Sequence, residues 1–182
     1  MKLRPLPSIL TGIVQSSLRV CNQTEYQVQG TCRSCGGILS GYDTRLKRFA
    51  IICNDEGDER IDVILHRAYC RACGRTWMPD APFYPGTRAG SPVVDLCRAL
   101  SETIPCGQVA TRLGQMGVRI DRGTVRSYCD ASFTPPPTIP VFGMNIPLSI
   151  ISLSSLSESQ DHAGHTNGED ILAACFYPSR ER

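Results

Sequence analysis

Four of the ten cysteines in this sequence stand in two short pairs. Two residues separate Cys32 from Cys35, and two separate Cys70 from Cys73. Two thiolates at this spacing can point at one metal ion, because the backbone between them folds into a tight knuckle. Two such knuckles supply the four ligands of a tetrahedral structural zinc site. The spacing therefore predicts one structural zinc ion (Zn2+), with iron as the main competitor for the same four sulfurs.

The residues beside the cysteines fit this interpretation. Gly36 and Gly74 directly follow the second cysteine of each pair and permit the positive φ that the loop needs. Arg33, Arg71 and Arg75 would offset the negative charge of a four-thiolate centre. A redox Cys-x-x-Cys is the alternative, but it normally needs one pair near a βαβ unit, which this sequence lacks. Because four cysteines leave no open coordination position for water, we expect a protein that is not an enzyme.

The other six cysteines are scattered singly along the chain. Cys53 and His66 could join a second metal site, but a free buried cysteine and a surface histidine are the simpler interpretation. This cysteine usage is typical of a reducing compartment. We find neither an apolar run of about 20 residues nor a convincing secretory signal. We therefore expect a cytoplasmic protein with no membrane partner.

A β-hairpin must bring the two knuckles together. The pairs are 34 residues apart, more than the roughly 15 to 20 of the simplest ribbon pattern. Residues 49–53 and 61–65 are rich in β-branched side chains, and the sequence NDEGDE between them has the chemistry of a turn. Tyr69 and Trp77, on either side of the second knuckle, would pack on this sheet. We predict a zinc ribbon over residues 30–79.

A helical segment follows the ribbon after a linker rich in proline and glycine, residues 80–90. Apolar residues at three- and four-residue steps predict helices over residues 91–102 and 106–116. A third helix is predicted over residues 121–129. A tight glycine-containing turn before the last of three short helices is typical of a helix-turn-helix, which we predict over residues 91–130.

Capping residues set the predicted ends of these helices. Ser91 resembles an N-cap, with Pro92 at the first helical position. Gly117 would end the second helix. Asp121 would cap the backbone N–H of Thr124 at the start of the third.

The two ends of the chain have weaker patterns. Residues 1–29 begin with a proline-rich sequence and read as an N-terminal arm or a cover for the next unit. Residues 131–182 contain clustered prolines and serine repeats, which predict a largely irregular, low-complexity tail. The sequence GEDILAACFYPS could form one short helix in it. The predicted fold class is α+β: a small zinc ribbon, a three-helix helix-turn-helix unit and this tail.

Charge is distributed unevenly along the chain. Residues 88–129 carry six Lys and Arg against three acids, whereas residues 130–182 carry two against six. This asymmetry is compatible with phosphate binding. It is much weaker than the strongly basic character of many nucleic-acid-binding domains, since the net charge is only +2.

Three stretches together resemble the N-terminal region of prokaryotic transposase-like proteins: YCRACGRTW, FYPGTRAGSPVVDLC and QVATRLGQMGVRIDRGTVRSYC. In that family a zinc ribbon precedes a helix-turn-helix that grips the DNA ends of the element. The resemblance covers residues 30–130 and implies binding to double-stranded DNA. Only 53 residues follow Cys129, too few for the nuclease domain of a transposase. We therefore expect a shortened relative, or a separate nuclease or recombinase subunit as partner.

A recognition helix lies in the major groove with its early residues facing base edges, while flanking cations meet phosphates. Mapped onto this sequence, the candidate DNA contacts are Arg112, Arg119, Arg122, Thr124, Arg126 and Ser127. Arg122 and Arg126 are the expected base contacts, because arginine can pair bidentately with guanine. Arg112 and Arg119 would reach the DNA backbone, and Val125 and Tyr128 should belong to the core.

Two alternatives remain for the helical segment. Its arginines could be ordinary solvated charges on a small helical bundle. The ribbon and the helices could also form a protein-interaction module that docks on a larger nucleic-acid enzyme, with the acidic tail in contact.

Overall fold

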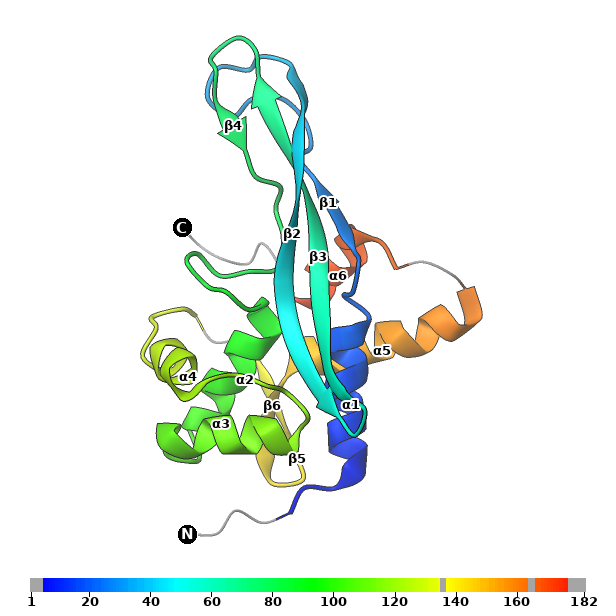
Figure 1. The fold of residues 1–182 in the computed structure, drawn as a ribbon, viewed down its shortest axis with the longest axis vertical. Helices are drawn as coiled ribbons and strands as arrows, with labels where there is room; N and C mark the ends of the chain where they lie inside the picture. Colours follow the sequence, from blue (N-terminus) through cyan, green and yellow to red (C-terminus); the bar gives the residue numbers. More distant parts are fainter. Residues whose placement is uncertain (1–4, 135–136, 164–165, 177–182) are drawn as a thin grey trace.

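A long β-hairpin and the helices packed around its lower half make up the chain, seen here as a computed structural model (Figure 1). The structure describes residues 5–134, 137–163 and 166–176. Helices and mostly antiparallel strands follow one another without βαβ units, so the predicted α+β class is confirmed. None of the helices in this described part combines the length and the apolar character needed to cross a bilayer.

The hairpin consists of β2 (Leu39–Asn54) and β3 (Gly57–Cys70). The strands pair antiparallel along their whole length, from Asn54 opposite Gly57 at the turn to Leu39 opposite Cys70 at the far end. β1 (Glu25–Gln27) pairs parallel with β3, and β4 (Thr76–Trp77) pairs antiparallel with the end of β3. The predicted hairpin is confirmed but is longer than its apolar runs, because residues 41–46 of β2 are all exposed and carry no alternating pattern.

The N-terminal segment covers the hairpin. Its helix α1 (Ser8–Arg19) buries Leu10, Val14 and Leu18 at four-residue steps. This face packs mainly against α5 (Leu148–Ala163) and also contacts β2. The described part of residues 1–29 thus packs onto the rest of the chain, through α1 on α5 and β1 on β3.

Three helices form the unit next to the hairpin: α2 (Ser91–Ser101), α3 (Cys106–Gln115) and α4 (Arg122–Cys129). Each of them contacts the other two. The three predicted helices are confirmed, and their ends agree with the structure to within one residue.

Two of the three predicted helix-capping residues are confirmed by the structure. Asp121 accepts a hydrogen bond from the Thr124 amide at 2.8 Å, as expected, and Gly117 follows α3 with a φ of +75°. The predicted N-cap of α2 is wrong by one position, because Gly90 holds the cap and Ser91 begins the helix. Ser91 is fully buried there, and its amide donates to the carbonyl of Pro82.

The prediction of a largely irregular tail is wrong. The described residues after α4 form β5 (Thr138–Val141), β6 (Met144–Pro147), α5 and α6 (Gly168–Ala174). Ile150 and Leu153 of α5 are fully buried. Serine is small enough to pack between helices, and Ser154 lies 3.2 Å from Ser16 of α1, Oγ to Oγ. The predicted short helix is confirmed as α6, although residues 177–179 lie outside the described part.

Backbone hydrogen bonds join the hairpin to the helical unit. The turn between α3 and α4 lies along the outer edge of β2: the Cys53 amide donates to the Gly117 carbonyl at 2.8 Å, and the Arg119 amide donates to the Ile51 carbonyl at 2.9 Å. These bonds satisfy polar groups that an edge strand would otherwise leave unpaired. Strand β2 and the turn between α3 and α4 therefore belong to one hydrogen-bonded framework.

Gly90 completes this join, and its replacement by alanine tests it. Its amide donates to the Phe49 carbonyl at 2.8 Å, and an added β-carbon would lie 2.2 Å from the Phe49 ring. We expect Gly90→Ala to lower the free energy of unfolding by about 2 kcal/mol, measured by urea denaturation, because the site is already filled. Gly114→Ala in α3 is the control. Its β-carbon would meet nothing within 4 Å, so it should leave stability unchanged or raise it by up to about 1 kcal/mol. Equal stabilities for the two variants would contradict the packing described for Gly90.

Candidate metal centre

The two knuckles meet at the end of the hairpin that points away from the helices (Figure 1). Cys32 and Cys35 lie in the loop between β1 and β2. Cys70 is the last residue of β3, and Cys73 lies in the turn before β4. Since Leu39 at the start of β2 pairs with Cys70, the register of the hairpin brings the first knuckle beside the second.

The four sulfurs have the spacing of a tetrahedral site. All four Sγ atoms lie within 4.8 Å of one another. The Sγ atoms of Cys32 and Cys73 are 3.6 Å apart, and those of Cys35 and Cys70 are 3.5 Å apart. Zinc–sulfur bonds of about 2.3 Å give a tetrahedron with edges of about 3.8 Å. The four predicted cysteines therefore come together in an arrangement compatible with one metal ion.

The two knuckles repeat the same backbone pattern. The amide of the glycine after the second cysteine donates to the carbonyl of the first: Gly36 to Cys32 at 2.8 Å, and Gly74 to Cys70 at 2.9 Å. A second bond, 2.9 Å in both knuckles, runs from the amide of the first cysteine to the carbonyl five residues later. The φ angles of Gly36 and Gly74 are +70° and +72°. This is the conformation that the sequence predicted for both glycines.

Backbone amides point at the sulfurs. Burial would raise the pKa of the Cys32 thiol, but hydrogen bonds that its sulfur accepts from the amides of Ser34 and Cys35 and from the thiols of Cys73 and Cys70 bring its pKa down to about 6. An amide that points at a sulfur stabilises the thiolate, which is the form that binds metal.

The sulfurs cannot all be thiolates without a cation. The Gly37 amide would lower the pKa of Cys35, but the thiols of Cys70 and Cys73, together with burial, raise its pKa to about 12. Four sulfurs at these distances therefore keep protons that a metal ion would displace. The donor set and its amides fit a soft divalent cation.

The basic residues beside the knuckles differ in their surroundings. Arg33 donates to Asp80 at 2.9 Å, whereas Arg71 and Arg75 are exposed. Tyr69 packs against Tyr42 of β2, with ring centroids 6.0 Å apart. The predicted packing of this aromatic residue on the sheet is confirmed.

Cys53 and His66 lie apart from this centre and from each other. The Cys53 thiol donates to Asp58 across the hairpin turn, at 3.2 Å. The His66 ring lies between Thr44 and Glu25 on the two neighbouring strands, at 3.1 and 3.2 Å. Within the described residues, the four-cysteine group is the one cluster of potential ligands that could hold a metal ion. Neither residue therefore joins a metal site with described residues, and Cys53 is a free thiol that is only partly buried, not buried as expected.

The residues predicted to contact DNA fall into two groups: some are exposed, and the others have side chains that already form hydrogen bonds or ion pairs within the chain. Arg122, Arg126 and Ser127 are exposed on the outer face of α4. The hydroxyl of Thr124 donates to the Asp121 carboxylate that caps the helix. Val125 is fully buried on the opposite side of α4, as expected for a core residue.

Arg112 and Arg119 are already engaged within the chain. Arg112 is only 7% exposed, and its Nη1 donates to the Gln115 side chain at 2.9 Å. Arg119 is exposed but forms an ion pair with Asp58 at the hairpin turn. Because Arg112 is buried, it does not lie on the surface from which we expected it to reach the DNA backbone.

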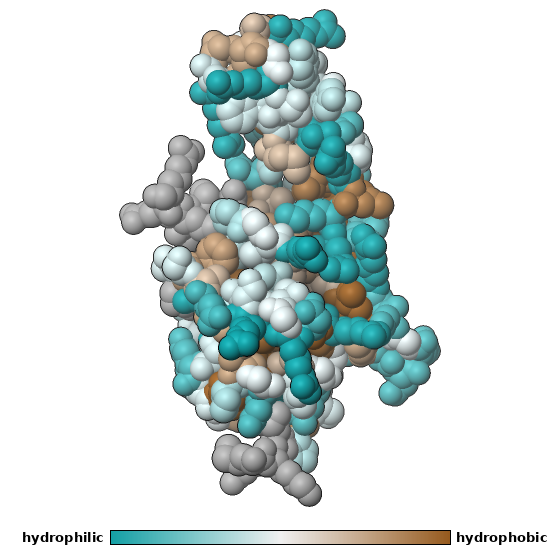
Figure 2. Space-filling model, turned by 60° about the vertical axis from the view of Figure 1, so that its left-hand side comes forward, coloured by the Kyte–Doolittle hydropathy of each residue, from teal (hydrophilic) through white to brown (hydrophobic). Residues whose placement is uncertain are grey.

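The side of the molecule that carries α4 is mainly hydrophilic (Figure 2). Its hydrophobic residues form small, separate groups rather than one broad patch.

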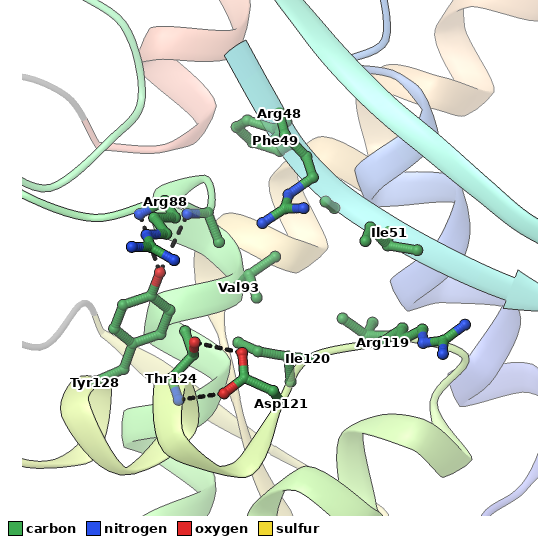
Figure 3. Close-up of a pocket in the computed structure, with 13 residues that line it drawn as sticks. Arg48, Phe49, Ile51, Arg88, Val93, Arg119, Ile120, Asp121, Thr124 and Tyr128 are labelled. Atoms are coloured by element: carbon green, nitrogen blue, oxygen red, sulfur yellow. Dashed lines mark hydrogen bonds between the residues drawn. The ribbon is translucent and has the colours of Figure 1, made fainter.

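Tyr128 of α4 is 5% exposed, as expected for a core residue, and its hydroxyl accepts hydrogen bonds from the amides of Arg88 and Ala89 (Figure 3). These bonds fix α4 to the linker.

Known proteins add no constraint on the chain. It matches no protein-family model, no curated protein and no solved structure.

Loss of one cysteine ligand should abolish metal binding. We expect purified protein to hold one metal ion per chain, measured by inductively coupled plasma emission against protein concentration. Cys32→Ser should lose the ion, because three thiolates and a hydroxyl bind it far more weakly. Cys53→Ser is the matched control and should keep it, since Cys53 lies at the other end of β2. Metal retained by Cys32→Ser would rule out the four-sulfur site.

Gly37 supports the four-cysteine cluster without being a ligand, a role that no local sequence pattern indicates. A β-carbon at this position would lie 3.0 Å from Cβ of Ala72, 3.1 Å from Sγ of Cys70 and 3.2 Å from Sγ of Cys35. We expect Gly37→Ala to weaken metal affinity about tenfold, measured by competition with a chromophoric chelator, because the sulfurs must move apart. Gly41→Ala, whose β-carbon would meet nothing within 4 Å, should bind as the wild type does. An unchanged affinity in Gly37→Ala would show that the sulfurs tolerate this crowding.

Proposed function

We propose that this chain is a DNA-binding protein in which a structural zinc ion shapes the ribbon and α4 is the recognition helix of a helix-turn-helix. In this role it is a transposase-related targeting or regulatory protein and not an enzyme. The observation that carries the proposal is the outer face of α4. Arg122 and Arg126 lie one helical turn apart there, both exposed, and neither forms an ion pair with a described residue.

The shape of α4 suits a major groove. Its eight residues make a rod about 12 Å long, and the groove is about 12 Å wide. Val125 and Tyr128 hold one side of the rod in the core, which leaves the arginine-bearing side to the solvent. A fixed inner face is what allows a short helix to present side chains in one orientation.

The proposed contacts follow from what each side chain is free to do. Arg122 and Arg126 are the proposed base contacts, and Ser127 lies beside them. Thr124 would contact DNA at the edge of this face, and Arg119 would reach a phosphate only by leaving Asp58. We leave Arg112 out of the proposed interface because it is buried.

Zinc is the proposed ion at the knuckles. A closed shell of four thiolates in a tetrahedron is the usual structural zinc site, and iron is its competitor. All ten cysteines are free thiols in the structure, which suits the reducing cytoplasm that we propose as the location.

Docking on a larger nucleic-acid enzyme is the second candidate function. Two large apolar side chains are exposed near the knuckles: Ile38 at 85% and Met78 at 49%. A protein surface could cover them, and a separate nuclease or recombinase subunit would be the partner. This candidate uses the knuckle end of the molecule, whereas DNA binding uses α4.

Replacing the two arginines of α4 tests DNA binding. Wild-type protein should bind a duplex selected from a random pool, with an affinity that falls as salt rises. In Arg122→Ala/Arg126→Ala we expect a loss of about 1 to 3 kcal/mol per base contact and weaker discrimination between sequences. Fluorescence anisotropy at several salt concentrations measures both.

The matched control removes two arginines elsewhere. Arg19 and Arg60 form ion pairs with Glu59 and Asp62 near the hairpin turn, so Arg19→Ala/Arg60→Ala loses the same charge away from α4. It should bind nearly as tightly as the wild type and with the same sequence preference. Equal behaviour of the two double variants would refute α4 as the recognition helix.

A further inference from the structure

A hollow of about 230 Å³ lies between β2 and α4 (Figure 3). Arg48 and Phe49 of β2 form one wall, and Arg88 in the linker forms another. Asp121 and Thr124 close it on the side of α4. The hollow thus borders the helix that we propose to enter DNA, and sequence patterns gave no sign of it because its walls come from three separate segments.

Two arginines at this hollow have side chains without a partner among the described residues. Arg48 extends from the strand into the hollow, and Arg88 lies across from it (Figure 3). Both residues are exposed. Within the described part of the chain, neither guanidinium group takes part in a hydrogen bond or an ion pair. Two like charges held at one hollow repel each other, so a bound anion would be stabilised there.

The other charged groups around the hollow are already committed. Arg119 pairs with Asp58. The carboxylate of Asp121 accepts hydrogen bonds from both the amide and the hydroxyl of Thr124. These bonds lower the pKa of Asp121, so its negative charge remains at neutral pH and is directed at the helix cap. Arg48 and Arg88 are therefore the groups available to a ligand.

We propose that this hollow binds a phosphate of the DNA backbone at the N-terminal end of α4. The inference rests on the proposed function and extends it. A recognition helix places its early residues against base edges in the major groove, so the phosphate backbone that borders the groove passes close to that end of the helix. The turn before α4 and the capping residue Asp121 line the hollow, whereas Arg122 and Arg126 are exposed on the other side of the helix.

The two guanidinium groups match the chemistry of a phosphodiester. Each offers several N–H donors in a rigid plane and stays charged at every physiological pH. A phosphate oxygen between them can accept from both, which a single surface arginine cannot provide. The contact carries no sequence information, because it reaches only the backbone. Its role is to set the orientation of α4 in the groove.

This contact makes the ribbon part of the DNA interface. Arg48 belongs to β2, the strand that begins beside the knuckles and whose far edge holds the turn before α4. The hairpin therefore supplies a phosphate ligand as well as support for the turn. The metal centre and the recognition helix would act on one duplex through the same strand.

A double substitution, Arg48→Gln/Arg88→Gln, tests the hollow by anisotropy titration of duplex DNA across a range of salt. Neutralising one phosphate fewer lowers the salt slope by about 0.9, which makes binding about eightfold weaker at 0.1 M salt. The sequence preference should not change. Arg48→Lys/Arg88→Lys should keep most of the slope, because the charge is retained. Arg19→Gln/Arg60→Gln is the control for lost charge, and the urea midpoints of all variants should equal that of the wild type.

The outcomes separate this inference from the proposed function. If wild-type protein shows no salt-dependent DNA binding, DNA recognition by this chain fails as a whole. If it binds and Arg122→Ala/Arg126→Ala loses preference, but Arg48→Gln/Arg88→Gln keeps the full slope and affinity, only the hollow is refuted. A changed base preference in Arg48→Gln/Arg88→Gln would mean a base contact and would also overturn it. Binding of inorganic phosphate that this variant loses, with an unaltered DNA slope, would assign the hollow to a free anion instead.

Discussion

Hydrogen bonds along the lower edge of β2 are the contacts on which the rest of the molecule depends. They attach the turn between α3 and α4 to Ile51 and Cys53, and the linker to Phe49. Together with the apolar core that the hairpin and the helices share, they join the two into one unit. With them, the position of α4 is set by the strand that leads to the metal centre, and the hollow beside α4 gets its second wall.

The upper half of the hairpin has the four-cysteine cluster at its end instead of an apolar core. Residues 41–46 of β2 are exposed on both faces, so apolar burial contributes little there. Two identical knuckles, each closed by backbone hydrogen bonds and a glycine with positive φ, hold the strand ends. A bound ion would add to this the free energy that a small core cannot supply. The hairpin thus has apolar packing at one end and, at the other, four cysteines that could hold a metal ion.

Local patterns predicted the parts of the structure that are locally determined. The cysteine spacing, the turn chemistry of NDEGDE and the Asp121 cap each depend on a few neighbouring residues, and all three appear in the structure. The tail was mispredicted because serine repeats suggest disorder unless a partner helix accepts them, as α1 does at Ser154. The burial of Arg112 and the meeting of Arg48 with Arg88 depend on distant segments. No window of sequence contains that information.

The open stretch of β2 has a consequence for how copies of the chain meet. Among the described strands, none pairs with the outer edge of β2 above Phe49, so its amides and carbonyls could accept a strand from another molecule. Residues 43–48 read DTRLKR, and four of the six side chains carry charge. Charged side chains along a free edge oppose intermolecular strand addition. The same arginines and lysine that make this strand basic thus also help keep the chains apart at high concentration.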